Sequence, residues 1–332
     1  KRFWRDLTSH YRYAIYSAKS ELKSEVANSY LNWIWWVLEP FCFMLIYAFI
    51  FGVVFEAREQ YFPAFIFIGI TAWDFFNRCL TQSVKLLKNN KSIVTKVYIP
   101  KFILLISKMF FNGYKMLFSF GIIVIMIIYF RIPITLNILY VIPSFIVLFV
   151  VTFACMTHLM HYGVFIQDLA NVTNIVLRMV FYMTGIFYNI EKRLPAQYTG
   201  ILMKGNPMAL VLSSLRKCIL YGQAPDVKWL IIWFIIGIIV AALGVRKIYK
   251  NENSYVFRSM ALCKGDLMEE NKNSAISVRN VCIDYKSLKT GSIKQNFFKL
   301  KKVEQEVFHA VRNVSFEVPE GQILGITGKN GS

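Results

Sequence analysis

The sequence predicts a mostly α-helical membrane protein with six transmembrane helices, followed by an incomplete α/β segment made mainly of strands. Hydrophobic residues make up 56% of the 332 residues and charged residues only 17%, whereas soluble domains carry about 25% charged residues. The apolar residues gather in long runs without alternation, which indicates membrane-spanning helices rather than barrel strands. After residue 250 the chain becomes polar and then alternating, which indicates a soluble segment.

The net charge of +19 is concentrated in the apolar part of the chain, before residue 251. Basic residues at membrane borders set the topology and meet anionic lipid, so we expect membrane lipid as a partner and no nucleic acid. A nucleic-acid-binding protein would instead gather its charge on a soluble face. The six cysteines form no C-x-x-C pair, so we expect neither a metal site nor a disulfide framework.

Residues 1–30 predict an amphipathic helix. Apolar residues recur along it at steps of three or four, which places them in one stripe of a helix. The stripe consists of Leu7, Tyr11, Ile15, Ala18, Leu22, Val26 and Tyr30. Basic residues lie elsewhere on its surface, so we interpret the segment as an interfacial helix on the inner leaflet. A soluble helix that packs on another domain is the alternative.

Residues 31–250 predict a transmembrane domain. Its six apolar runs are 33–55, 62–83, 102–130, 134–157, 172–188 and 229–245. The loop 84–101 carries lysines and no acid, and the segments before the first run and after the last are basic too. The positive-inside rule therefore places both termini in the cytoplasm. The segment 189–228 then lies outside, where its short apolar stretches predict re-entrant or interfacial helices.

Charged residues inside the apolar runs are candidate functional residues because a charge in lipid is costly. Asp74 and Arg78 lie four residues apart, which predicts an ion pair within one helix. Glu39 and Arg178 have no such neighbour, so they either pair across helices or line a polar path for a substrate.

Trp33 and Trp36 complete the candidate substrate path, because stacked aromatic rings can contact a substrate over an apolar face without binding it tightly. The alternative is an aromatic girdle at the membrane surface together with core packing. Lys108 and Lys115 either contact an anionic headgroup or extend toward the interface, and for Lys108 we favour the second interpretation.

The loop 84–101 also sets apolar residues in a basic surrounding: Ile93, Val94, Val97, Tyr98 and Ile99. An apolar ridge on a cytoplasmic loop needs a partner surface, so the pattern predicts a docking element. The alternative is a loop that touches the membrane interface. Pro100 stands at a position that favours the start of the next helix.

Residues 251–274 predict a polar linker, and residues 275–332 predict a soluble segment. Alternation predicts strands at 275–285 and 311–318, and a short apolar run predicts a buried strand at 322–327. This run leads into the first part of a phosphate-binding P-loop, whose glycines let backbone N–H groups turn toward phosphate. The residues concerned are Gly328, Lys329, Asn330, Gly331 and Ser332. A simple turn is the alternative.

The tail resembles the start of an ABC transporter nucleotide-binding domain. The stretch AVRNVSFEVPEGQILGITGKNGS is similar to the strand, turn, strand and Walker A loop of that family, cut before the phosphate-binding lysine. ISVRNVCIDYK is similar to its opening strand. The resemblance implies that Tyr285 stacks on adenine, with strand-end packing as the alternative, and that ATP and Mg²⁺ are cofactors of the complete domain. We expect the segment alone not to hydrolyse ATP.

Residues 1–250 resemble the permease of type-2 ABC exporters that move polysaccharides such as teichoic acids and O-antigens. The resemblance rests on SYLNWIWWVLEPF, GITAWDFF, NNKSIVTKVYIPKFIL, FIQDLANV and GNPMALVLSSLRKCILYGQAP. The chain departs from the family at Glu39, where Asn is usual, at Gln167, where Arg is expected, and at Gly185, where Pro is common. The resemblance implies two cytoplasmic loops that couple the permease to its ATPase. The coupling residues would be Lys91, Ile93, Val97, Tyr98, Pro100, Gln167 and Asp168.

We therefore expect one half of a homodimeric ABC exporter that uses ATP to move a lipid-linked polysaccharide across the cytoplasmic membrane of a bacterium. Its partners would be a second copy or a paired permease, an ABC ATPase domain and the lipid-linked glycan. An exporter of a drug or another lipid, and a polytopic sensor with a regulatory P-loop-like tail, remain as alternatives. A membrane-embedded transferase lacks support because no cluster of Asp, His or Ser stands at a membrane border, and no catalytic residue is expected.

Overall fold

The computed structural model describes residues 2–27, 32–54, 59–96, 99–193, 195–252, 254–255, 274–287 and 306–319. The chain forms two compact units, Lys1–Cys263 and Lys264–Ser332. The boundary between the units lies inside the segment 251–274, for which the sequence predicts a linker.

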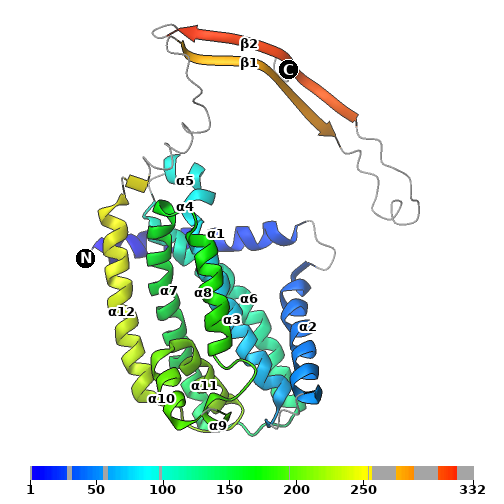
Figure 1. Ribbon diagram of the computed structural model, residues 1–332, viewed down its shortest axis with the longest axis vertical. Helices are drawn as coiled ribbons and strands as arrows, with labels where there is room; N and C mark the ends of the chain where they lie inside the picture. Colours follow the sequence, from blue (N-terminus) through cyan, green and yellow to red (C-terminus); the bar gives the residue numbers. More distant parts are fainter. Residues whose placement is uncertain are drawn as a thin grey trace. The chain divides into compact units, whose positions relative to one another are not determined.

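The first unit is a helical bundle with α1 (Arg2–Val26) lying across one end, as Figure 1 shows. The short helices α4 (Leu86–Asn89) and α5 (Lys91–Lys96) lie at that same end. The remaining α-helices are α2 (Trp35–Phe49), α3 (Phe62–Val84), α6 (Lys101–Tyr129), α7 (Val141–Phe165), α8 (Leu169–Met183), α9 (Ile190–Arg193), α10 (Ala196–Gly205), α11 (Pro207–Ile219) and α12 (Val227–Lys250). Short helices of other types are η1 (Asn32–Ile34), η2 (Ile50–Val54, a π-helix) and η3 (Leu136–Tyr140).

Four helical segments of the described residues are long and apolar enough to cross a membrane: Trp35–Gly52, Lys101–Tyr129, Leu136–Phe165 and Val227–Lys250. They correspond to the first, third, fourth and sixth apolar runs of the sequence. The second run forms α3, whose polar residues lower its hydropathy.

The fifth apolar run forms α8, a 15-residue helix that rises about 22 Å and is shorter than a hydrocarbon core of about 30 Å. The sequence predicts that this run extends to residue 188, but the helix ends at Met183. The end is set by Gly185, whose φ of 69° is a left-handed conformation that closes a helix.

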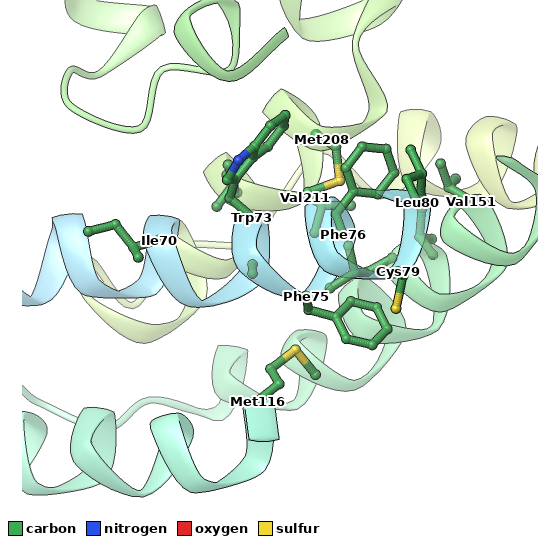
Figure 2. Packing of buried hydrophobic residues seen from close by; sticks show 14 of the residues in the cluster. Ile70, Trp73, Phe75, Phe76, Cys79, Leu80, Met116, Val151, Met208 and Val211 are labelled. Carbon is green, nitrogen blue, oxygen red and sulfur yellow. The ribbon is translucent and has the colours of Figure 1, made fainter. Parts of the chain in front are cut away.

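Helix α3 is the centre of the bundle and contacts α2, α6, α7, α8 and α11. Most of its side chains are buried. Figure 2 shows them packed among side chains of α6, α7 and α11, including Phe75, Phe76, Leu80, Met116, Val151, Met208 and Val211. A helix packed against several others needs less lipid-compatible surface, which explains why α3 tolerates Asp74 and Arg78 while α7 carries no Asp, Glu, Lys or Arg.

Helices α7 and α12 pack at close range because two glycines of α12 face α7. A Cβ at Gly237 would lie 2.8 Å from Val150 Cγ1, and a Cβ at Gly244 would lie 2.1 Å from Thr157 Oγ1. The glycines and their α7 neighbours both repeat every seven residues, so the same faces meet over two turns. Small residues at such a contact let two backbones approach, which is the usual basis of helix association in membranes.

The second unit is described as one antiparallel hairpin of β1 (Ser274–Ser287) and β2 (Glu306–Pro319). Val278 pairs with Phe316 and Val281 with Val314, and register shifts interrupt the ladder between these pairs. The strands predicted at 275–285 and 311–318 are confirmed by β1 and β2. The strand predicted at 322–327 and the P-loop residues Gly328, Lys329, Asn330, Gly331 and Ser332 lie outside the described residues.

Candidate functional site

A polar cluster lies between three helices of the bundle. We define the polar cluster as Glu39 of α2, Asp74 and Arg78 of α3, and Asn112 and Lys115 of α6. The Arg78 guanidinium donates to the Glu39 carboxylate, with 2.8 Å between Nη2 and Oε2. Because charges within largely apolar helices are costly unless they are paired, this ion pair ties α2 to α3 and marks a functional candidate.

The prediction that Arg78 forms its ion pair with Asp74 within α3 is wrong. Arg78 makes its ion pair with Glu39 on the neighbouring helix rather than with Asp74 one turn away. A pair within one helix contributes only about 0.2–0.5 kcal/mol, whereas the interhelical pair neutralises a second charge that would otherwise be isolated on α2. Of the two roles predicted for Glu39, the ion pair across helices is the one that the structure contains.

A small pocket of about 30 Å³ lies beside Asp74 and Arg78. Two of its polar atoms, Thr71 Oγ1 and Asn112 Oδ1, are buried and have no hydrogen-bond partner among the described residues. The other end of the Asn112 amide is fully used, because its Nδ2 donates to Gln82 Oε1 at 2.9 Å and to the Lys108 carbonyl at 3.0 Å. An unpaired buried polar atom costs about 1–3 kcal/mol, and the pocket has room for one or two waters. The pocket is thus suited to water or to a polar group of a ligand.

The candidate path residues separate into two groups. Trp36 lies at the polar cluster, with the Lys115 ammonium 5.7 Å from its ring centroid. The rings of Trp33 and Trp36 both pack on Phe118 of α6, at 5.8 and 5.6 Å between centroids. Arg178 is exposed on α8 and makes no hydrogen bond or ion pair to any described residue. The structure therefore gathers Glu39, Trp33 and Trp36 and leaves Arg178 outside.

Lys108 and Lys115 hold α1 on the bundle. Lys115 Nζ lies 2.6 Å from Glu25 Oε2, and Lys108 forms an ion pair with Glu21. Each lysine therefore has a carboxylate of α1 close enough to neutralise its charge within the protein, a pairing that sequence reasoning did not predict; the headgroup and interface roles stay predictions. A sequence signal existed, since Glu21 and Glu25 lie one helical turn apart on an otherwise basic helix.

Helix α1 is also fixed at its other end. Arg2 forms an ion pair with Glu252 at 3.3 Å, and the Tyr249 hydroxyl donates to Asp6 Oδ2 at 2.8 Å. The ring of Phe3 packs against that of Phe102 of α6, with 5.0 Å between centroids. Helix α1 is thus bound to the bundle along its length, while one side remains exposed.

The first predicted coupling loop forms α4 and α5. Its apolar side chains turn inward: Val94 and Ile99 are 4% and 7% exposed, and Ile93 packs against the same core. The exposed apolar ridge predicted here is therefore wrong for Val94 and Ile99, which lie in the core, whereas Ile93 is half-buried against it. Pro100 caps α6, as predicted. Lys91 opens α5, while Val97 and Tyr98 lie outside the described residues.

The second predicted coupling loop joins α7 to α8, and Gln167 and Asp168 are exposed there. Its helix α7 contacts α4. A Cβ at Gly163 of α7 would lie 2.2 Å from the carbonyl oxygen of Val84, so the chain approaches closely where α3 ends. The two loops therefore belong to one end of the bundle, the end that carries α1 in Figure 1.

The opposite end is organised by Arg216, a residue that sequence reasoning treated only as one of several loop cations. Its side chain is 5% exposed, and it donates to the carbonyls of Phe65, Gly185 and Ile186 at 3.1, 2.7 and 2.8 Å. The guanidinium also lies 3.5 Å from the Phe65 ring centroid. These bonds join α3, the turn after α8 and α11. The helix α11 is itself started by Asn206, whose side chain accepts from the backbone of the first turn.

Glu59 adds a second connection at this end. Its carboxylate is 7% exposed, lies 2.8 Å from Lys192 Nζ and accepts from the Tyr221 hydroxyl at 3.0 Å. Burial, reinforced by the Glu59 carboxylate, raises the pKa of Tyr221 above its ordinary value, so the hydroxyl remains a donor. The segment predicted to form re-entrant or interfacial helices is therefore a cross-linked cap of α9, α10 and α11.

In the second unit, Tyr285 of β1 stands opposite Phe308 of β2 in the strand register. Among the residues that the structure describes, no group of three or more His, Cys, Asp or Glu side chains is placed to hold a metal ion.

Comparison with known proteins places the first unit in a wider context. The sequence profile of the ABC-2 type transporter family matches residues 15–220. The chain is 25% identical over 226 residues to the O-antigen export system permease protein RfbA of Klebsiella pneumoniae, a match that covers 68% of this chain and 86% of that protein. It is 24% identical over 230 residues to the protein of the same name from Myxococcus xanthus, covering 68% and 87%. The profile match includes the polar cluster and both predicted coupling loops and excludes the hairpin.

Proposed function

Because this chain belongs to the ABC-2 type transporter family, we propose that it is the permease half of an ATP-driven exporter of a lipid-linked polysaccharide. The observation that carries the proposal is the similarity to O-antigen export permeases over 86% of their length. The exported glycan belongs to the O-antigen, teichoic acid or capsule type. The protein is a multi-pass component of the cytoplasmic membrane of a bacterium.

The bundle crosses the membrane six times in this proposal, with α3 and α8 added to the four apolar spans. Helix α3 crosses between α2, α6, α7, α8 and α11, so most of its side chains are shielded from lipid. Both termini and α1 lie on the cytoplasmic side, and the cap of α9 to α11 lies outside. The lysines of the loop 84–101 support this orientation.

The substrate path runs beside α2, where Glu39, Trp33 and Trp36 meet α3 and α6. Aromatic rings offer a glycan apolar contact without tight binding, and the pocket at Thr71 and Asn112 supplies polar atoms that are not yet satisfied. A second copy of the chain, or a paired permease, completes the path. The exposed surface of α2 supports this, because Phe43, Leu45 and Phe49 lie on it uncovered.

The second unit is the beginning of an ABC ATPase domain, with Tyr285 in its adenine contact and residues 328–332 in its phosphate loop. ATP with Mg²⁺ supplies the free energy for transport once the domain is complete. The loops that carry Lys91, Ile93, Val97, Tyr98 and Pro100, and Gln167 and Asp168, transmit the motion of that domain to the bundle. The exposure of Gln167 and Asp168 and the closeness of α4 to α7 support a joint docking end.

The proposal is tested by deleting the gene in its host and measuring surface polysaccharide together with lipid-linked glycan inside the cell. We expect surface glycan to disappear and lipid-linked glycan to accumulate, and the wild-type gene to reverse both. Glu39→Gln removes the partner of Arg78, so it should restore export only partly at equal membrane abundance. Unchanged surface glycan together with altered drug tolerance would favour a drug exporter instead.

A further inference from the structure

An apolar groove of about 880 Å³ lies on the surface of the bundle, walled by α1, α6, α7 and α12. Its volume falls within the range of about 300–1,000 Å³ that accommodates small-molecule ligands. Phe3 and Leu7 of α1, Phe110 of α6 and Ala242 of α12 are among the residues that line it. The groove is distinct from the polar cluster, since none of the five cluster residues lines it.

One cation stands at the edge of this apolar groove. Arg246 of α12 lines the groove, is exposed, and makes no hydrogen bond or ion pair with any residue that the structure describes. The nearby acidic side chains are already used, because Asp6 accepts from Tyr249 and Glu252 pairs with Arg2. The rim of the groove therefore carries an uncompensated positive charge.

The α1 wall of the groove carries exposed side chains of the kinds that lie at membrane surfaces. Trp4 lines the groove and is 67% exposed, and Trp settles at the depth of lipid headgroups. Arg5, whose side chain is 78% exposed, follows it on the same helix. The wall is held in place by the bonds of Arg2 and Tyr249 at the end of α12. The groove is thus a fixed feature with an apolar floor and a basic edge.

We propose that this groove binds an anionic membrane phospholipid, with its acyl chains on the apolar floor and its phosphate at Arg246. An acyl chain matches the uniformly apolar walls, and a guanidinium binds phosphate through paired hydrogen bonds. Charge complementarity selects an anionic headgroup over a zwitterionic one, because none of the described residues that line the groove carries a carboxylate to hold an ammonium group. The site is independent of the exported substrate.

The test uses the full chain, purified in mild detergent and analysed by native mass spectrometry after addition of phosphatidylglycerol or phosphatidylethanolamine. We expect wild-type protein to retain phosphatidylglycerol at least five-fold more than phosphatidylethanolamine. Arg246→Gln should reduce that ratio to about one and still retain lipid. Ala242→Trp fills the groove and should abolish retention of both lipids. Ala242→Leu fills less of the groove and should give an intermediate loss, which keeps the test decisive even where the larger tryptophan ring impairs folding.

Two variants serve as matched controls. Leu243→Trp adds the same ring to the next, lipid-facing residue of α12, and Lys250→Gln removes a charge at the same helix end outside the groove. Both should behave as wild type. Equal retention of the two lipids by wild type, or an unchanged ratio in Arg246→Gln, would overturn the proposal. The proposal would also be overturned if Ala242→Trp lost the dimer or a bound lipid-linked glycan and kept its phospholipid.

Discussion

Replacement of Arg216 by methionine should destabilise the first unit strongly. The side chain is buried and donates to the carbonyls of Phe65, Gly185 and Ile186, which come from α3 and from the turn after α8. Methionine is apolar and similar in length to the aliphatic part of the arginine side chain, so the substitution removes the hydrogen-bond donors with little change in volume. The three carbonyls then lose this donor in a region that excludes most water.

The magnitude follows from two acceptors left without a partner, the carbonyls of Gly185 and Ile186, and from one lost bond to Phe65, whose carbonyl keeps its helical bond in α3. Each buried unsatisfied group costs about 1–3 kcal/mol. We take the lower half of that range because Arg216 lines a pocket of about 150 Å³ that can admit water. The expected loss is about 3–5 kcal/mol, which corresponds to a decrease in Tm of about 6–20 °C for a unit of this size.

The assay is thermal unfolding of detergent-purified protein followed by size-exclusion chromatography. Lys217→Gln is the matched control, because Lys217 is the next residue of α11 and its ion pair with Glu191 is only partly buried, so it should cost about 0–1 kcal/mol. Arg216→Lys should fall between, since one ammonium cannot reach three carbonyls in the geometry of a guanidinium. A Tm for Arg216→Met equal to that of Lys217→Gln would refute this reasoning.

Three further experiments test the packing of the bundle. Gly69→Ala places a Cβ 2.5 Å from Arg216 Nη2 and should cost about 1–3 kcal/mol, measured as a loss of Tm. Gly163→Ala places a Cβ 2.2 Å from a backbone oxygen that cannot yield easily, so it should cost about 3 kcal/mol in the same assay. A double-mutant cycle of Lys115→Gln and Glu25→Gln should give a coupling free energy of about 1 kcal/mol, with faster proteolysis of α1 in both single variants.

The control for both glycine substitutions is Gly121→Ala in α6, where nothing lies within 4 Å of the added Cβ. That change should stabilise the protein by about 0.5–1 kcal/mol, because alanine favours a helix over glycine. Equal Tm values for all three variants would show that the close approaches at Gly69 and Gly163 can relax. Additive effects in the cycle would show that the α1 ion pair contributes no net coupling.

Local periodicity was enough to predict much of the fold. The long apolar runs became α2, α6, α7 and α12, and the alternation at 275–285 and 311–318 became a hairpin. Both patterns depend only on neighbouring residues, because a helix repeats every 3.6 residues and a strand every two. The same logic failed at the end of α8, where a single positive φ at Gly185 ended the helix before the apolar run ended.

The candidate site was predicted less well, because its geometry depends on partners far apart in the chain. Glu39 and Trp36 were predicted and do lie at the polar cluster, and Trp33 packs with Trp36 on Phe118. Arg178 was placed with them and lies elsewhere, since its helix turns that residue outward. Asn112 was not predicted at all, although an amide inside an apolar run was a visible signal.

The sequence alone determined the positions of the apolar helices, the amphipathic nature of α1 and the change to strands after residue 270. Each of these features is a property of one continuous stretch of residues. Only the tertiary structure decided which charges pair. Lys115 meets Glu25 across 90 positions, and Arg78 turns to Glu39 rather than to Asp74. The physical reason is that a buried charge is stabilised by whatever opposite charge packing brings within reach, and packing is determined by the whole set of helices.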